Sequence, residues 1–307
     1  MTSMRIPAIL ECRSLISFFL GRIRWLPSLL GAHRCIVLQW VPILAYENYS
    51  SHMGRVRAGY QSRPIKRRES VTLFALLHGG MHNGSSWDLV AENLISRGHQ
   101  VVAPDLPVDD DAAGAVEWAR VAIEAIDQAP DRADPDDVIM VGHSISGLCV
   151  PVAATLRPVR RMVFVAGLLP VPGKAYVEEL AANADAISFP APDATGEGPF
   201  GLTWESVRAG FYHDCPEALA QKTFHEFRHQ SFTVFTERCP IERWPDAPST
   251  YVLMRDDRAL EAGWVRRNAV DRLGMDVVEL DGGHSPFFAR AGELCDLLTS
   301  VASASAS

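Results

Sequence analysis

The chain has 307 residues, of which 48% are apolar and 21% are charged, the balance of an ordinary globular protein. This length can bury a large core in one big domain, or in one domain with a sizeable insertion. Residues 1–70 carry 11 basic and 3 acidic side chains, whereas the remaining residues carry 18 and 34. The acidic body argues against nucleic acid as a binding partner.

Residues 1–70 form a basic segment that we expect to be a poorly ordered N-terminal extension. Its apolar run Leu15–Leu20 is followed by Arg22 and Arg24, so it falls well short of the roughly 20 apolar residues that span a bilayer. No stable membrane insertion is therefore expected. The basic, acid-poor composition also suits an amphipathic membrane-surface or transit segment, and this alternative stays open.

The six cysteines are scattered along the chain, and no two of them have the spacing of a metal site or a thioredoxin motif. In a chain of this length they indicate reduced, mostly buried thiols and a cytoplasmic protein, in preference to a secreted disulfide framework. The six are Cys12, Cys35, Cys149, Cys215, Cys239 and Cys295.

From Val71 onward, apolar runs typical of buried strands alternate with segments of helical spacing. The predicted strands cover residues 71–77, 100–103, 138–141 and 159–165. The predicted helices cover residues 87–97, 116–126 and 148–156. Strands that alternate with helices at this interval indicate βαβ units and a parallel sheet.

The alternation stops between about residues 168 and 249, where Pro- and Gly-rich loops separate helical pieces. These pieces carry the aromatic residues Trp204, Phe211, Tyr212, Phe224 and Phe227. The strand pattern returns at 250–254 and 276–280, with helices predicted at 262–273 and 293–301. An insertion between two strands of one sheet is most simply a lid over the strand ends. We therefore expect one domain at 71–303, with a helical cap at 168–249 before the penultimate strand.

The third predicted strand ends in Gly142-His143-Ser144, and a helix pattern begins a few residues later. A serine on a sharp turn between a buried strand and a helix is a nucleophile elbow. The turn forces strained backbone angles on the serine, so the residues two before and two after it must be small. Gly142 meets the first requirement, and Ser146 stands at the second position, where glycine is usual. Ser146 is itself a poorer nucleophile candidate, because bulky Leu148 follows it at that spacing.

Acyl transfer by a serine also needs a histidine base and a carboxylate that orients the base. With this kind of elbow, the acid follows the serine in the chain and the histidine comes last. The last two predicted strands lead into Asp256-Asp257 and into His284, respectively. The carboxyl ends of parallel strands meet at one edge of a sheet, where ligands bind. Ser144, His284 and one of the two aspartates are therefore the predicted catalytic residues.

The oxyanion of such a reaction needs two backbone N–H donors. One is predicted at Ile145, directly after the nucleophile at the start of a helix. The other is predicted in the loop His78-Gly79-Gly80-Met81-His82, where glycine lets the backbone approach a substrate oxygen closely. Gly80 is the preferred residue for this second donor.

Three stretches of the chain resemble one branch of the α/β-hydrolase superfamily, the branch of plant methylesterases and hydroxynitrile lyases with many bacterial relatives. They are His78-Gly79-Gly80-Met81-His82-Asn83-Gly84-Ser85-Ser86-Trp87, Gly142-His143-Ser144-Ile145-Ser146-Gly147 and Gly282-Gly283-His284-Ser285-Pro286-Phe287. The resemblance covers about residues 71–300 and implies the α/β-hydrolase fold, an α/β architecture with a mostly parallel sheet flanked by helices. In that branch the acid falls where Asp257 stands, followed by an apolar turn like Ala259-Leu260, so Asp257 is preferred over Asp256.

Two positions distinguish the chain from the lyases that it resembles. Those lyases carry a lysine directly after the catalytic histidine and a threonine in the oxyanion loop, whereas this chain has Ser285 and Gly79 there. Cyanohydrin cleavage is therefore disfavoured and ester hydrolysis preferred. Related epoxide hydrolases and haloalkane dehalogenases use an aspartate nucleophile, which Ser144 argues against.

The resemblance implies a carboxylesterase that works without a cofactor or a metal. Aromatic residues of the insertion, if they line the site, favour a small to medium, fairly apolar ester as the substrate. A homo-oligomer is compatible with these features.

Two other functions stay open. His225-Glu226-Phe227-Arg228-His229 matches H-E-x-x-H, in which a helix presents two zinc ligands one turn apart with a glutamate base between them. A catalytic zinc requires a third protein ligand, for which no matching continuation of the motif exists. We therefore interpret this stretch as lid structure, with Phe224 and Phe227 facing inward. The second alternative is a ligand-binding protein that keeps the fold with an idle triad.

Overall fold

The computed structural model describes residues 71–130, 134, 136–184, 186–188 and 202–304. The predicted extension at 1–70 lies outside these described residues, so what was expected of it stays a prediction. Within the described part of the chain, no helix is both long enough and apolar enough to cross a membrane.

In the part of the chain that the structure describes, six parallel strands form one sheet in the order β2-β1-β3-β4-β5-β6. The strands are β1 (Leu73–Leu77), β2 (Gln100–Val102), β3 (Val138–His143), β4 (Arg161–Val165), β5 (Ser249–Met254) and β6 (Asp276–Leu280). β1, β3 and β4 are buried along their whole length, as expected for central strands covered on both faces. Every predicted strand is present with its ends within two residues of the expected ones, so the predicted parallel sheet is confirmed.

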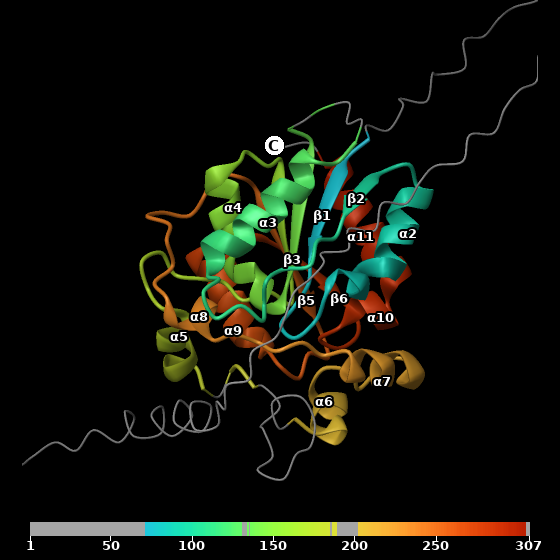
Figure 1. The fold of residues 1–307 in the computed structure, drawn as a ribbon, viewed down its shortest axis with the longest axis vertical. Coiled ribbons are helices and arrows are strands. Elements are labelled where there is room, and N and C mark those ends of the chain that lie inside the picture. The colour runs from blue at the N-terminus through green and yellow to red at the C-terminus, as the bar shows by residue number, and fades with distance from the viewer. Residues whose placement is uncertain (1–70, 131–133, 135, 185, 189–201, 305–307) are drawn as a thin grey trace, which may run out of the picture. The chain divides into compact units, whose positions relative to one another are not determined.

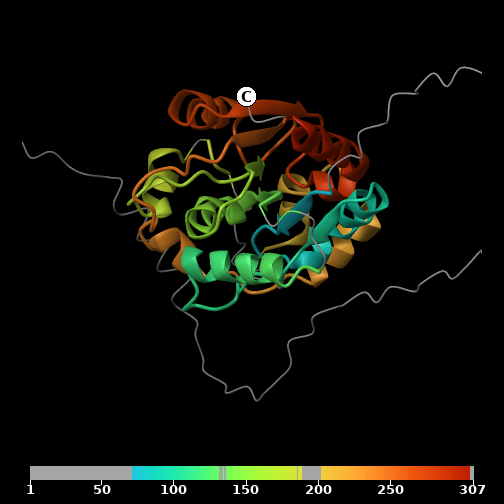
Figure 2. The ribbon, with the colours of Figure 1, turned by 90° about the horizontal axis from the view of Figure 1, so that it is seen from above.

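Helices cover both faces of this sheet (Figures 1 and 2). α2 (Asp88–Ser96) and α11 (Ala291–Ser303) contact each other on one face, and α3 (Ala115–Asp127) and α4 (Val150–Leu156) contact each other on the opposite face. The chain first adds β2 on one side of β1 and then returns to add β3 on the other side. Right-handed crossovers that run in opposite directions put their helices on opposite faces, so this reversal produces three layers.

Two of the predicted helices are divided. The one expected at 148–156 begins earlier as a 3₁₀ helix, η2 (Ser144–Leu148), and continues as α4, because the sharp turn before it winds the first residues tightly. The one expected at 262–273 consists of α9 (Ala262–Arg266) and a π-helical turn, η4 (Arg267–Arg272). Two short helices, η1 (Gly84–Trp87) and α10 (Pro286–Ala289), complete the layers.

Four described helices lie between β4 and β5, beyond the carboxyl ends of the strands in the lower part of Figure 1. They are α5 (Tyr176–Ala182), α6 (Trp204–Gly210), α7 (Glu217–His225) and α8 (Thr233–Thr236). We call the described residues between β4 and β5 the cap. The helical insertion predicted before the penultimate strand is therefore present.

The predicted sharp turn joins β3 to η2. Ser144 has a positive φ of 52°, in the left-handed region that residues with a side chain rarely adopt. A Cβ on Gly142 would lie 2.5 Å from Val150 Cγ2, and a Cβ on Gly147 would overlap the Leu168 carbonyl oxygen. The turn therefore requires glycine at both positions.

The side chain of Ser146, at the position where glycine is usual, is fixed by hydrogen bonds of its hydroxyl. Its Oγ lies 2.9 Å from the carbonyl oxygen of Leu77 and 2.9 Å from that of His143, and its proton can be donated to either. Leu77 is the last residue of β1. The Ser146 hydroxyl thus ties the serine turn to the strand that precedes the predicted oxyanion loop.

We expect Gly147→Ala to unfold at a lower urea concentration than the wild type, because the added Cβ overlaps the Leu168 carbonyl oxygen. Overpacking of this kind costs about 1–3 kcal/mol. The matched control is Gly292→Ala in α11, where nothing lies within 4 Å of an added Cβ and alanine favours the helix by up to about 1 kcal/mol. Urea unfolding followed by circular dichroism measures both variants. If the urea midpoint of Gly147→Ala equals that of the wild type, the turn tolerates a side chain at position 147.

Candidate active site

The side chains of Ser144, His284 and Asp257 meet just after the carboxyl ends of β3, β6 and β5, respectively. The Ser144 Oγ lies 3.1 Å from His284 Nε2, and His284 Nδ1 lies 3.0 Å from Asp257 Oδ2. Because a carboxylate only accepts hydrogen bonds, Nδ1 carries the ring proton and Nε2 accepts the Ser144 hydroxyl proton. The structure therefore brings these three predicted residues together, although Ser144 and His284 are 140 positions apart in the chain.

The turn after β5 directs its two aspartates to different partners. The side chain of Asp257 is only 4% exposed, and its Oδ1 accepts hydrogen bonds from the backbone N–H groups of Ala259 at 2.7 Å and Leu260 at 3.2 Å. These donors stabilise a carboxylate whose burial would otherwise be costly. Asp256 is exposed and accepts instead from the Gly282 N–H at 3.2 Å. Asp257, the preferred candidate, is thus the aspartate that reaches the histidine.

The two predicted oxyanion donors adjoin each other. An ideal Cβ on Gly80 would lie 3.4 Å from Ile145 Cγ2, and one on Gly79 would lie 3.4 Å from the Ser144 Cβ. The loop after β1 therefore lies directly against the serine turn. Among the described residues the Gly80 N–H has no hydrogen-bond partner, so it can bind an incoming oxygen.

His78 orients the peptide that carries the Gly80 N–H. Its Nδ1 lies 2.8 Å from the Gly79 carbonyl oxygen, and its Nε2 accepts a hydrogen bond from the Leu106 N–H at 2.9 Å. Because the carbonyl only accepts, Nδ1 carries the proton and both ring nitrogens are satisfied. In a planar trans peptide the N–H points away from the C=O. By holding the Gly79 carbonyl, His78 therefore directs the Gly80 N–H to the opposite side.

His82 orients the next peptide in the same way. Its Nδ1 lies 2.5 Å from the Gly80 carbonyl oxygen, so Nδ1 carries the proton. Its Nε2 then accepts a hydrogen bond from the Tyr212 hydroxyl of the cap at 2.6 Å. Both peptides that flank Gly80 are thus held by a histidine.

His143 binds the main chain of His284, the predicted base. Its Nε2 donates a hydrogen bond to the His284 carbonyl oxygen at 2.9 Å, and the two ring centroids are 4.9 Å apart. Its buried Nδ1 has no partner among the described residues and would lie 2.5 Å from a Cβ on Gly79. A side chain at position 79 would therefore displace the ring that supports His284.

These three rings are uncharged because they are buried. Burial lowers the pKa of His78 to about 3 and that of His82 to about 4, and it lowers the pKa of His143 well below its ordinary value. The sequence predicts no role for any of the three. The available signal was position alone, since His78 and His82 lie on either side of Gly80, the predicted oxyanion donor, and His143 directly precedes Ser144.

Two residues of the cap hold the loop that carries His284. The Phe211 ring stacks on the His284 ring, with centroids 5.2 Å apart and planes inclined by 29°. The Asp214 carboxylate accepts a hydrogen bond from the Gly283 N–H at 2.9 Å. Phe211 was expected only as a cap aromatic, and its contact with the histidine comes from the tertiary structure.

The H-E-x-x-H stretch does not form the helix that a zinc site of this type needs. α7 ends at His225, and the Arg228 N–H donates to the Met81 carbonyl oxygen at 2.7 Å instead of continuing the helix. His225 and His229 therefore do not lie one turn apart on a helix face. Within the described residues, no group of three or more histidine, cysteine or acidic side chains could hold a metal ion.

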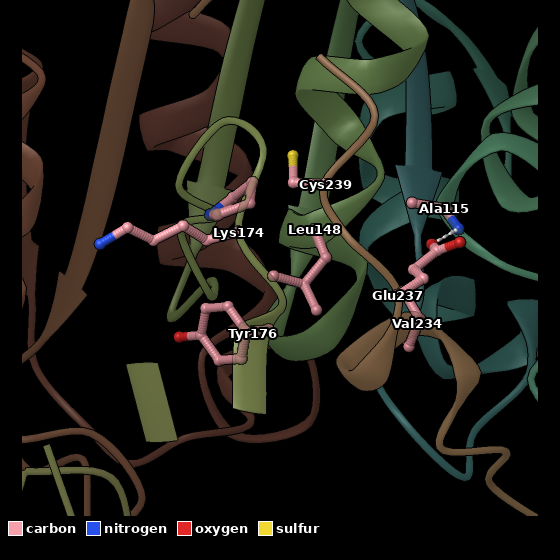
Figure 3. A pocket seen from close by; sticks show the side chains of 8 residues that line it. Ala115, Leu148, Lys174, Tyr176, Val234, Glu237 and Cys239 are labelled. Carbon is pink, nitrogen blue, oxygen red and sulfur yellow. Dashed lines mark hydrogen bonds between the residues drawn. The ribbon is translucent and has the colours of Figure 1, made fainter. Parts of the chain in front are cut away.

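A small pocket lies between the cap and the start of α3 (Figure 3). It is lined by Ala115, Leu148, Pro170, Lys174, Tyr176, Val234, Glu237 and Cys239. The Glu237 carboxylate accepts a hydrogen bond from the Ala115 N–H at 2.5 Å, and burial raises its pKa. No predicted catalytic residue lines this pocket. Glu237 is instead an attachment of the cap to α3.

A parallel sheet with helices on both faces and a serine on a strained strand-to-helix turn defines the α/β-hydrolase class of fold. The chain belongs to the alpha/beta hydrolase family, whose sequence profile matches residues 74–297.

Similar proteins place the chain in the expected branch of that family. It is 27% identical over 253 residues to methylesterase 7 of Arabidopsis thaliana, which covers 75% of this chain and 95% of the relative. It is 26% identical over 256 residues to an alpha-hydroxynitrile lyase of the same plant, with 75% and 96% covered. A solved structure of a pyrethroid hydrolase from Sphingobium faniae has a TM-score of 0.62 at 23% identity, covering 77% of this chain and 99% of that one. The predicted resemblance is confirmed, and the esterase-type relatives support a hydrolase.

The buried neutral histidines predict a loss of stability in mild acid. His78 and His82 have pKa values of about 3 and 4 in the fold but near 6.5 when exposed, so below pH 6.5 the unfolded chain binds more protons. The free energy of unfolding therefore falls as the pH drops from 6.5, by up to about 1.4 kcal/mol per pH unit for each histidine.

We expect His82→Gln to make this decline shallower by about 1 kcal/mol per pH unit between about pH 6 and 5, because one proton uptake is removed. Urea unfolding at several pH values measures it. The control is His225→Gln, an exposed residue of the cap, which should keep the slope of the wild type. An unchanged slope in His82→Gln would contradict a buried, neutral ring at that position.

Proposed function

We propose that the protein is a serine hydrolase of the carboxylesterase type, with Ser144 as nucleophile, His284 as base and Asp257 as the residue that orients the base. The observation that carries this proposal is the unbroken series of contacts from the Ser144 Oγ to His284 Nε2 at 3.1 Å and from His284 Nδ1 to Asp257 at 3.0 Å.

In the first half of the reaction, the Ser144 Oγ attacks the carbonyl carbon of the ester and His284 Nε2 takes the hydroxyl proton. The carbonyl electron pair moves onto the oxygen, which the N–H groups of Gly80 and Ile145 stabilise. The Asp257 carboxylate stabilises the imidazolium. When the intermediate collapses, the bond to the leaving oxygen breaks, and that oxygen takes the proton from Nε2 and departs as the alcohol.

In the second half, His284 Nε2 takes a proton from water while the water oxygen attacks the acyl carbon. The second tetrahedral intermediate uses the same two N–H donors. Its collapse breaks the bond to the Ser144 Oγ, which regains its proton from His284, and the carboxylic acid is released.

Hydrolysis is favoured over cyanohydrin cleavage by the residues that replace those of the similar lyases. Ser285 stands where those lyases carry lysine, and Gly79 stands where they carry threonine. A Cβ at position 79 would lie 2.5 Å from His143 Nδ1, so this site is built around glycine. The site therefore lacks the added cation and the added hydroxyl of the lyases.

A small to medium, fairly apolar ester suits the aromatic side chains near the oxyanion loop. Ring contacts run from His82 to Phe227 at 5.1 Å, from Phe227 to Phe224 at 5.5 Å, and from Phe224 to Trp204 at 5.9 Å. Phe224 is buried and Phe227 packs against the core, in agreement with the inward orientation expected for both. Aromatic surroundings of this kind favour apolar acyl or alcohol groups.

A cytoplasmic location is part of the proposal. It rests on the cysteines, because the four within the described residues, Cys149, Cys215, Cys239 and Cys295, are free thiols.

We expect the wild type to hydrolyse p-nitrophenyl acetate and to be labelled by a fluorophosphonate, and Ser144→Ala to lose the labelling and at least about 10³-fold in kcat/KM. The control is Ser85→Ala, an exposed serine, which should retain both properties. Equal rates for wild type and Ser144→Ala would mean a binding protein with an idle triad. If a chelator abolishes the activity of the wild type and the fluorophosphonate does not label it, the result indicates zinc chemistry instead.

A further inference from the structure

Met81 has a backbone conformation that needs support from outside the oxyanion loop. Its φ is 64°, in the left-handed region, although it is not glycine. A non-glycine residue in this region is strained and persists where surrounding contacts hold it. Met81 directly follows Gly80, whose N–H is a proposed oxyanion donor.

Both polar groups of the Met81 main chain are bound by the cap. The carbonyl oxygen of Met81 accepts the Arg228 N–H at 2.7 Å, and its N–H donates to the Gln230 Oε1 at 3.2 Å. Arg228 is itself fixed, since its guanidinium donates to the Leu106 carbonyl oxygen at 2.9 Å and pairs with Asp109 at 2.5 Å. This part of the cap therefore lies along the oxyanion loop.

The Gln230 carboxamide has its own orientation fixed. Its Nε2 donates to the Ser231 carbonyl oxygen at 2.8 Å, and the Ser231 N–H donates to the Val108 carbonyl oxygen at 2.6 Å. With the amide nitrogen engaged in this way, Oε1 is the atom that faces Met81. The Gln230 side chain is thus a fixed acceptor supplied by the cap.

The peptide between Gly80 and Met81 is held at both ends. His82 donates to its carbonyl oxygen at 2.5 Å, and Gln230 accepts from its N–H at 3.2 Å. His78 holds the preceding peptide through the Gly79 carbonyl oxygen. The Gly80 N–H lies in the plane that His78 holds, and the Gly80 backbone bonds join this plane to the one that His82 and Gln230 hold. With the second plane held, the first cannot turn by rotation about those bonds, so the direction of the Gly80 N–H is kept.

Gln230 also lies against Gly80 itself. Its Oε1 would lie 3.0 Å from a Cβ on Gly80, on the side where Ile145 Cγ2 would lie at 3.4 Å. The charge of the side chain at position 230 therefore acts on an oxygen bound between Gly80 and Ile145. A neutral amide is tolerated there, whereas a carboxylate would repel a developing oxyanion.

We propose that Gln230 is a positioning residue of the oxyanion hole, through which the cap holds the Gly80 N–H in the direction that stabilises the intermediate. This role rests on the proposed function. An oxyanion-hole N–H binds the oxygen most strongly when that oxygen carries the developing charge, so we expect the contribution of Gln230 in kcat and not in KM.

Two substitutions separate the hydrogen bond from the charge. Gln230→Met keeps the size of the side chain and removes the acceptor, and we expect kcat to fall about tenfold while KM stays within about twofold. Gln230→Glu keeps an acceptor for the Met81 N–H but adds a negative charge, and we expect it to lose about 100-fold in kcat. The matched control is Gln221→Met, an exposed glutamine of α7, which should retain wild-type kinetics.

A trifluoromethyl ketone analogue of the ester, whose hemiketal oxygen occupies the oxyanion position, provides a readout of the hole itself. In Gln230→Met the inhibition constant of this ketone should rise about tenfold, the same factor by which kcat/KM falls. The dissociation constant of the alcohol product should stay unchanged. Rates are expressed per active site titrated with the fluorophosphonate, so a variant that merely folds less well keeps its kcat.

Unchanged kcat and unchanged ketone inhibition in Gln230→Met, with an active wild type, overturn the positioning role and leave the proposed function intact. A wild type without Ser144-dependent hydrolysis overturns both. If Gln230→Met does not fold, Gln230→Ala decides, because it also removes the acceptor for the Met81 N–H. A loss of kcat and of ketone inhibition in Gln230→Ala supports the role, and wild-type values overturn it.

Discussion

The requirement that three buried imidazole rings stay uncharged underlies the whole arrangement at the carboxyl edge of the sheet. A neutral ring offers one donor and one acceptor, and here carbonyl oxygens select which nitrogen donates. His78 and His82 each hold a peptide of the oxyanion loop, and His143 holds the main chain of His284. A second proton on His78 would confront the Leu106 N–H with another donor, in surroundings from which water is excluded. The geometry of the proposed catalytic groups therefore depends on the burial of these three rings.

The cap is connected to the rest of the fold by specific contacts around the candidate active site. Glu237 binds the start of α3, Gln230 binds the oxyanion loop, and Phe211 and Asp214 hold the loop that carries the histidine. The last three of these residues each join the cap to a loop at the edge of the sheet, and Glu237 joins it to a helix. One fold can carry different reactions, because activity depends on the residues of the site and not on the sheet.

Much of the fold could be predicted because its signals are local. A buried parallel strand is a short run of apolar residues, and the apolar residues of an amphipathic helix recur about every 3.6 positions. Both patterns can be recognised within a short stretch of sequence. The serine turn was predictable for the same reason, since the strain at Ser144 imposes small residues nearby. The helix expected from the H-E-x-x-H pattern was not formed, because the Arg228 N–H bonds to Met81 and not to the preceding turn. A competing partner far away in the chain cannot be seen in a motif of five residues.

The amino-acid sequence by itself determined the order of strands and helices along the chain, the position of the sharp turn at Ser144 and the family. The family resemblance already preferred Asp257, and its contact with His284 agrees with that preference. The tertiary structure alone decided which histidines hold the predicted oxyanion loop, and that Gln230 lies against Gly80. The physical reason is that the first set depends on backbone preferences and side-chain periodicity over a few residues. The second set depends on hydrogen bonds whose directions exist only when several loops have been brought to the same edge. Met81 and Gln230, which meet at 3.2 Å, are 149 positions apart in the chain.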